Sequence, residues 1–177
     1  GTKADLAEGR SRHLEAALSA WERCQKLGIR MKLNTVVCRA NLDDNMADLA
    51  RRLNPDRWKV FQVLPVDGQN DGRIEKLLIS ENEFSRWVQR HERLLKGEIG
   101  FIAESNELMT GSYVMIDSLG RFYSNVDGKH MYTRPILEVG IKEAWSENQF
   151  YEHRFIEREG IYDWRTLPST DDDCNSG

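Results

Sequence analysis

Two short stretches of the sequence carry cationic side chains two residues apart, in segments that otherwise alternate like β-strands. Lys32 and Asn34 share one face of the first segment, and Arg57 and Lys59 share one face of the second, because side chains in a strand alternate with a period of two. If these strands are neighbours, the polar groups line one pocket. A buried cluster of cations is unfavourable unless an anion occupies it. A phosphorylated ligand fits, since arginine binds phosphate in a bidentate manner and lysine acts as a point charge.

The same spacing permits a plainer interpretation. The cations could sit at strand ends and pair with surface carboxylates, because the chain contains 29 acidic residues and most charged side chains are simply solvated. Arg57 also begins its segment, whereas the active groups of barrel enzymes lie at the carboxyl ends of strands. Spacing alone leaves both interpretations open.

For four further polar residues, the simplest interpretation is a structural role or exposure to solvent. Tyr113 opens a predicted hairpin strand, where a buried tyrosine packs its ring and hydrogen-bonds its hydroxyl. Arg158 lies at the polar end of a short predicted helix. Lys129 and His130 lie in a glycine-containing loop, where we expect them to be solvated. None of the four indicates chemistry through its spacing.

The elements that position the cationic segments alternate between helix and strand. Apolar residues at helical spacing predict a helix over 10–27, and alternation predicts a strand over 29–37. A second predicted helix is capped by Asn41 and ended by Asn54 and the following proline, and a second strand covers 57–66. Helix, strand, helix and strand with short connections are typical of a parallel sheet, either open or closed into a (β/α) barrel.

The pattern changes after the turn-rich loop 67–72. Ser80 and Glu83 form a capping box that opens a helix over 81–96, and the alternating stretch "SYVMIDSLGRFYSN" over 112–125 predicts a β-hairpin. The predicted remainder consists of two short helices, "PILEVGIKEAW" and "NQFYEHRFIERE", and a disordered acidic tail over 168–177.

Composition narrows the class of protein. The net charge is −4, which argues against a duplex-binding protein, since such proteins need a broad basic surface. No apolar run approaches the roughly twenty residues of a membrane helix, and the first residues lack a signal-peptide pattern, so we expect no transmembrane segment and a cytoplasmic location.

The cysteines and histidines show no metal-ligand spacing, and the three cysteines, Cys24, Cys38 and Cys174, are far apart. We therefore predict no metal ligands in this chain.

Several longer strings of the sequence are specific enough to compare with known families. They are "KLNTVVCRAN", "LNPDRWKVFQVLPVDGQN", "ENEFSRWVQRHE", "ESNELMTGSYVMIDSLGRF", "ILEVGIKEA" and "FIEREGIYDW". Together these strings resemble the viperin family of radical S-adenosylmethionine enzymes. They occur in the family's order and cover the chain from about Leu14 to Trp164. The strings are long and chemically unusual, so the resemblance is specific.

The resemblance implies an α/β fold, namely the C-terminal part of a partial (β/α)6 barrel followed by an α+β extension. The expected regions are barrel repeats over 1–72, an α+β region over 73–167 and the tail over 168–177. The implied cofactors are S-adenosylmethionine and a [4Fe–4S] cluster. The implied reaction converts a ribonucleoside triphosphate, CTP or UTP, to its antiviral 3′-deoxy-3′,4′-didehydro analogue. An external electron donor is implied, and no nucleic acid partner.

The resemblance also assigns roles to individual residues. It places the triphosphate on Lys32, Arg57 and Lys59 with Asn34 beside them. It places Tyr113 near the ribose as a hydrogen or proton donor. The remaining implied contacts are Arg158 and either Lys129 or His130 with the phosphates, and Val63 with the adenine of S-adenosylmethionine.

The sequence differs from the family pattern in one major respect. The C-x-x-x-C-x-x-C cluster motif and the glycine-rich stretch after the first strand are absent. We therefore expect cluster ligands outside this chain, in an N-terminal half of the same enzyme. Two alternatives stay open, namely a radical enzyme acting on a peptide and a non-catalytic module that binds a nucleotide or a partner protein.

Overall fold

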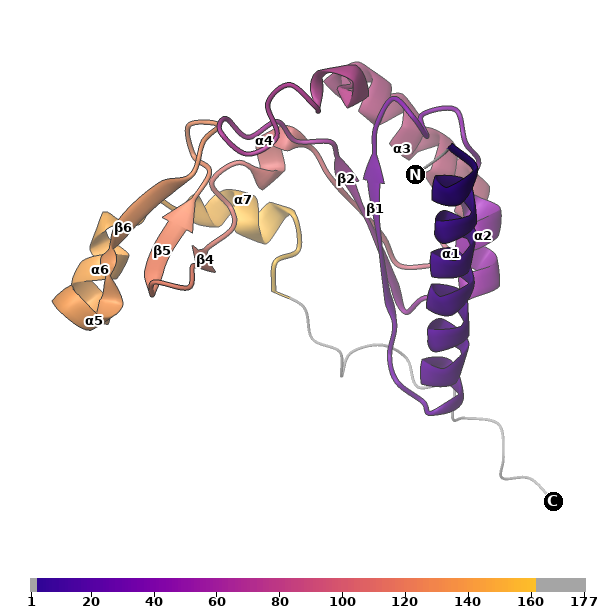
Figure 1. Ribbon diagram of the computed structural model, residues 1–177, viewed down its shortest axis with the longest axis horizontal. Helices are drawn as coiled ribbons and strands as arrows, with labels where there is room; N and C mark the ends of the chain where they lie inside the picture. Colours follow the sequence, from indigo (N-terminus) through magenta and orange to yellow (C-terminus); the bar gives the residue numbers. More distant parts are fainter. Residues whose placement is uncertain (1–2, 162–177) are drawn as a thin grey trace. The chain divides into compact units, whose positions relative to one another are not determined.

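The computed structural model describes residues 3–161, with side chains from residue 12 onward (Figure 1). The chain forms two compact units, of which unit 1 ends at Glu107 and unit 2 begins at Leu108. It is a mixed α/β protein. The elements that begin in unit 1 are α1 (Lys3–Lys26), β1 (Lys32–Val37), α2 (Ala47–Leu53), β2 (Arg57–Gln62), η1 (Glu75–Leu77), α3 (Glu81–Leu95), β3 (Phe101–Glu104) and α4 (Asn106–Met109).

Unit 1 is built on a parallel three-stranded sheet with the order β1-β2-β3. Helices α1, α2 and α3 lie along one side of β1 and β2 in Figure 1. That side carries the hydrophobic core, in which Trp58 and Val60 are fully buried between the sheet and the helices. Inside this core the indole Nε1–H of Trp58 donates to Thr35 Oγ1 at 2.9 Å, so the buried polar group is satisfied. The opposite face of the sheet carries the cationic side chains.

Helix α3 begins where the sequence predicts. The Ser80 hydroxyl accepts a hydrogen bond from the Glu83 N–H, and the Glu83 carboxylate accepts one from the Ser80 N–H, which is the capping box. The Arg39 guanidinium and these Ser80 donors lower the pKa of Glu83 to about 2. The buried side chains of α3 are Phe84, Trp87, His91 and Leu95. They repeat at three to four residues and so form one inward stripe.

Helix α2 begins later than the sequence predicts. Asn41 is not its cap, because the helix begins at Ala47 and Met46 occupies the N-cap position. The Asn41 side chain instead holds the turn after β1, accepting from the Cys38 N–H and donating to the Val36 carbonyl. Asparagine favours this local bonding in turns as much as at caps. The predicted end is confirmed, since Asn54 adopts a left-handed conformation with φ of 42°.

Unit 2 contains an antiparallel sheet with the order β4-β5-β6. The predicted hairpin is confirmed, and its turn is closed by Asp117, whose carboxylate accepts from the N–H groups of Leu119 and Arg121. The third strand was not predicted, because the stretch around "KHMYTR" was interpreted as loop. The elements are β4 (Met115–Ile116), β5 (Arg121–Ser124), β6 (Met131–Pro135), α5 (Ile136–Val139), α6 (Ile141–Glu147) and α7 (Glu152–Glu157).

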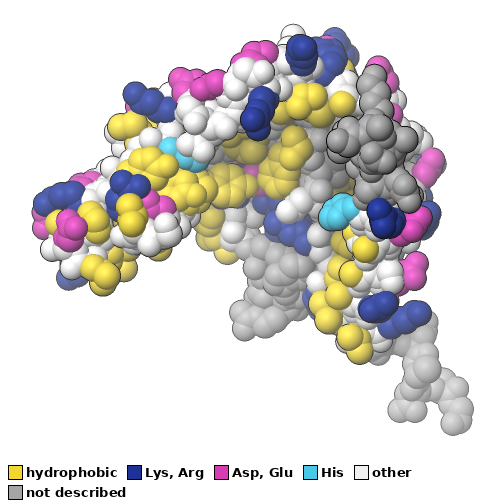
Figure 2. All heavy atoms as spheres, in the orientation of Figure 1, with side chains coloured by type: hydrophobic (Ala, Val, Ile, Leu, Met, Phe, Trp, Pro, Cys, Tyr) yellow, Lys and Arg dark blue, Asp and Glu magenta, His cyan; other side chains and the backbone are white. Residues whose placement is uncertain are grey.

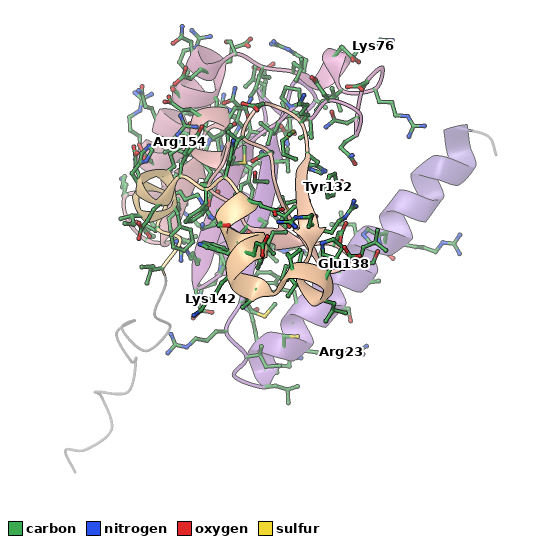
Figure 3. The ribbon with its side chains drawn as sticks, turned by 90° about the vertical axis from the view of Figure 1, so that its left-hand side faces the viewer. Arg23, Lys76, Tyr132, Glu138, Lys142 and Arg154 are labelled. Carbon is green, nitrogen blue, oxygen red and sulfur yellow. The ribbon has the colours of Figure 1, made fainter. Side chains whose placement is uncertain are left out.

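The small core of unit 2 depends on aromatic residues. Phe122 is buried and meets Trp145 edge to face at a centroid distance of 5.5 Å. Many apolar side chains remain at the surface over the β5–β6 and α5–α6 region, interspersed with Lys and Arg (Figure 2). Tyr132 on β6 and Lys142 on α6 are marked in Figure 3. The predicted acidic tail over 168–177 lies outside the described residues.

Candidate functional site

The parallel register brings the predicted cations of unit 1 onto one sheet face. Lys32 is the neighbour of Arg57, and Asn34 is the neighbour of Lys59. Register neighbours in parallel strands point to the same face, about 4.8 Å apart. This face is opposite to the one that packs against α2 and α3. The two cationic strands are therefore neighbours, which is the condition that the sequence analysis set for a shared pocket.

The residues of this polar face differ in their exposure. Arg57 and Lys59 are only 3% and 4% exposed, whereas Lys32 and Asn34 at the sheet edge are exposed. Buried cations of this kind require hydrogen-bond acceptors or counter-charges. Lys32 and Asn34 are therefore the accessible polar side chains of this face in the described residues, and Arg57 and Lys59 are the buried ones.

Glu104 supplies one counter-charge. It is the last residue of β3, lies beside Phe61 in the register and is fully buried. Its carboxylate accepts from the Lys59 ammonium in a buried ion pair. This pair fixes the Lys59 head group at the carboxyl end of the strands, although Lys59 itself starts from mid-strand. Glu104 was not singled out in the sequence, because a lone glutamate after a short apolar stretch carries no signal of its partner.

The carboxyl end of β2 is held by two amide side chains. The Gln62 amide donates to the Ile79 carbonyl at 3.1 Å and accepts from the Asn106 N–H at 3.0 Å. The Asn106 amide donates to the Val63 carbonyl at 3.2 Å, and the Val63 N–H donates to the Val37 carbonyl. Gln62 and Asn106 were not singled out in the sequence, because an amide side chain carries no periodic signal.

These contacts bear on where S-adenosylmethionine could fit. Val63 is 5% exposed, and its N–H and C=O both take part in hydrogen bonds. The structure therefore shows Val63 as a buried residue at the end of β2, and its contact with adenine stays a prediction. Among side chains from residue 12 to residue 161, no group of three or more His, Cys, Asp or Glu could hold a metal ion. The described residues therefore do not provide ligands for an iron–sulfur cluster.

Tyr113 and Arg158 meet within unit 2. The Arg158 guanidinium carbon lies 3.8 Å from the centroid of the Tyr113 ring, which is a close cation–π contact. Arg158 is only 6% exposed, and its Nη2 donates to the Ser112 carbonyl at 2.8 Å. Arg158 therefore restrains both the ring of Tyr113 and the backbone just before it. The default interpretation of these two residues as unrelated packing groups misses this contact.

Lys129 and His130 lie in the connection between β5 and β6. Lys129 is exposed as predicted, whereas His130 is half-buried against the ring of Tyr123, at a centroid distance of 5.0 Å. Tyr123 also stacks on Tyr132 across the strands, at 5.3 Å. The expectation that His130 is solvated is therefore wrong, because the unpredicted strand β6 places aromatic side chains around it.

The fold and the site define an α/β protein whose parallel sheet presents a cationic face. No protein-family model matches the chain. Three relatives share the description "S-adenosylmethionine-dependent nucleotide dehydratase". The protein of Flammeovirga pacifica is 49% identical over 138 residues, which is 78% of this chain and 46% of the relative. That of Lacinutrix mariniflava is 40% identical over 150 residues, 85% of this chain and 31% of the relative. That of Oncorhynchus mykiss is 35% identical over 163 residues, 89% of this chain and 46% of the relative.

These similarities place the chain with relatives that are described as S-adenosylmethionine-dependent. More narrowly, it belongs to the viperin-like family of nucleotide dehydratases. The chain spans less than half the length of the curated relatives it matches. Within the described residues, no helix is both long enough and apolar enough to cross a membrane.

Proposed function

We propose that this chain is the substrate-binding part of a radical S-adenosylmethionine nucleotide dehydratase. The substrate is a ribonucleoside triphosphate, CTP or UTP, and the product is its 3′-deoxy-3′,4′-didehydro analogue, an antiviral chain terminator. The chain forms the C-terminal part of a partial barrel and its α+β extension, and the protein works in the cytoplasm. The relatives act on nucleotides according to their description, and the polar sheet face offers a site of matching charge.

One observation carries this proposal: the register of β1 and β2 places Lys32 beside Arg57 and Asn34 beside Lys59 on one sheet face. Three cations at neighbouring register positions give this face positive charge, of which the Glu104 carboxylate offsets that of Lys59. A triphosphate supplies several negative charges and many acceptor oxygens in a small volume. Arginine suits bidentate contact with such oxygens, and the two lysines supply point charges.

The counter-charge on Glu104 gives this face a defined resting arrangement. The carboxylate holds the Lys59 ammonium in one place, so the ammonium is already oriented when a phosphate approaches. Preorganised charges interact more strongly with a ligand because no reorganisation is needed at binding. Asn34 supplies a neutral amide beside the cations and can donate to a phosphate or a ribose oxygen.

Unit 2 contributes the residues assigned by resemblance. Tyr113 is proposed to donate hydrogen or a proton near the ribose, and Arg158, Lys129 and His130 to contact phosphates. The cation–π contact of Arg158 with the Tyr113 ring supports a shared role, because it fixes the orientation of the phenol. Val63 is proposed to lie near the adenine of S-adenosylmethionine.

The cofactors determine the reaction class. When bound, S-adenosylmethionine and a [4Fe–4S] cluster reduced by an external electron donor supply a 5′-deoxyadenosyl radical. We propose that the cluster ligands lie in the N-terminal half of the same enzyme, which the matched part of the relatives leaves unaligned. The residues of this chain then bind and orient the nucleotide and shield it from water.

The test is nucleotide binding by the complete enzyme, measured by isothermal titration calorimetry with each of the four ribonucleoside triphosphates. We expect Lys32→Ala to weaken binding of the preferred triphosphate by about tenfold, the effect of one lost charge-assisted hydrogen bond. Lys76→Ala is the matched control, because Lys76 is an exposed lysine on η1. Equal binding by both variants, or no binding of any triphosphate, would overturn the proposal and favour a peptide substrate or a scaffold role.

A further inference from the structure

A second cationic surface lies on the helix side of unit 1, away from the polar sheet face. A groove of about 510 Å³ runs between α3 and the turn that follows β1. Its volume is within the range of small-molecule sites, about 300 to 1,000 Å³. The charged residues that line it are Arg39, Asp43, Glu83, Arg86, Arg90 and Arg93.

The charges in the groove do not balance. Arg39 forms a bidentate ion pair with Glu83, at 2.5 and 3.0 Å, so these two residues neutralise each other. Asp43 is then the one carboxylate left in the lining to oppose three guanidinium groups. The whole chain has a net charge of −4, which makes a local excess of positive charge unusual for this protein.

The three remaining arginines are arranged as one surface. Arg86, Arg90 and Arg93 follow one another at spacings of four and three along α3, so they lie on the same face of the helix. Within the part of the chain that the structure describes, none of them forms a salt bridge. Their charges are therefore available to a ligand.

Backbone contacts fix two of these groups in advance. Arg90 Nη2 donates to the carbonyls of Leu42 and Asp44, at 2.8 and 3.0 Å, and Arg93 Nε donates to the Gln89 carbonyl at 3.1 Å. Carbonyl oxygens orient a guanidinium but do not cancel its charge. Arg90 Nε is buried and finds no acceptor within residues 12–161, and such a group gains when a ligand supplies an oxygen.

We propose that this groove is a second anion site, which binds a small phosphate-bearing ligand such as a diphosphate group. The arginines favour phosphate because guanidinium groups bind its oxygens in pairs. The predominance of charged groups in the lining favours a compact polyanion over a large apolar ligand. The groove is separate from the polar sheet face, where we propose that the triphosphate binds. The groove is lined by α3 and the turn after β1, whereas the polar sheet face is the side of the sheet opposite α3.

The test is a titration of the chain with inorganic pyrophosphate, followed by ¹⁵N-resolved NMR of the arginine Nε–H groups and the tryptophan indole N–H groups. We expect saturable shifts for Arg86, Arg90, Arg93 and Trp87. We expect the Arg86→Ala and Arg93→Ala double variant to weaken binding by at least tenfold. Arg52→Ala, which removes an exposed arginine outside the groove, should leave the dissociation constant unchanged.

Three outcomes would overturn this proposal. The first is the absence of saturable shifts at these groups while the spectrum stays that of a folded chain. The second is equal affinity for citrate, because a carboxylate ligand would then explain the site equally well. The third is a set of shifts confined to residues of the polar sheet face, which would leave the proposed nucleotide function unaffected.

Discussion

At the scale of single residues, the Lys59–Glu104 pair fixes the position of the Lys59 ammonium on the polar sheet face. Both side chains are almost completely buried, and a buried ion pair is weak evidence for stability but strongly constrains geometry. Its two residues come from neighbouring strands. The pair therefore couples the position of a proposed phosphate-binding group to the pairing of β2 with β3.

We predict that Glu104→Gln destabilises the chain by about 3 kcal/mol, because it removes the negative partner of a buried ammonium. Urea unfolding followed by tryptophan fluorescence measures the change. Glu92→Gln makes the same chemical change at an exposed position of α3 and should shift stability by less than about 0.5 kcal/mol. Equal stability of the two variants would show that the pair contributes nothing.

A substitution at Tyr113 can separate the proposed chemical role of its hydroxyl from the packing role of its ring. Tyr113→Phe keeps the ring that lies 3.8 Å from the Arg158 guanidinium carbon and removes only the hydroxyl. We predict that the KM for the nucleotide stays within about twofold, while the rate of product formation falls by tenfold or more, as for loss of a general acid. Initial rates at varied nucleotide concentration measure the KM, and single-turnover product analysis measures the rate of product formation. An unchanged rate would mean that Tyr113 has only a packing role.

At the scale of elements, His91 joins α2 to α3. Its Nε2 accepts from the Met46 N–H at 3.1 Å, and its Nδ1 bonds the Trp87 carbonyl at 2.8 Å. This arrangement requires a neutral ring with the proton on Nδ1. Burial lowers the pKa of His91 below its ordinary value of 6.5, and nearby Arg90 acts in the same direction.

Because the pKa of His91 is lower in the folded state, the free energy of unfolding decreases as the solution becomes more acidic. The unfolded state binds the proton more readily than the folded state, so the contribution of His91 is fully present above pH 6.5 and declines as pH falls below it. We predict that the urea midpoint falls between pH 7 and pH 5. The fall should be smaller in His91→Gln. A pH profile identical to that of the native chain would contradict this role.

The capping box of α3 gives a second prediction for an element. Ser80→Ala removes the acceptor of the Glu83 N–H and should cost about 1 kcal/mol. Ser85→Ala is the matched control, because Ser85 is exposed within the same helix and alanine there is neutral or slightly stabilising. If both variants have the same urea midpoint, the box does not set the start of α3.

The elements also show what can be predicted from the sequence and what cannot. The capping box at Ser80 and the end of α2 at Asn54 were predictable, because each depends on residues that lie close together in the sequence. The start of α2 was not, because Asn41 can cap a helix or hold a turn with the same bonds. Glu104 was missed for a different reason: its role depends on pairing between β2 and β3, which lie about forty residues apart.

At the scale of the whole molecule, the comparisons identify the family, and the mixed α/β fold is consistent with it. The chain matches less than half of each of the three relatives, and its described residues bring together the proposed phosphate-binding cations without iron ligands. The proposal implies that two parts of the enzyme have different roles. This part selects and orients a nucleotide, and the rest of the enzyme generates the radical.

The most direct test is the release of 5′-deoxyadenosine by the complete enzyme with its cluster reconstituted, measured by mass spectrometry with each ribonucleoside triphosphate in turn. We predict that one triphosphate, CTP or UTP, stimulates release and is converted to its 3′-deoxy-3′,4′-didehydro analogue. Lys32→Ala should reduce this stimulation by about tenfold at subsaturating nucleotide, whereas Lys76→Ala should retain it. Release that is equal with and without every triphosphate would contradict a nucleotide site on the polar sheet face.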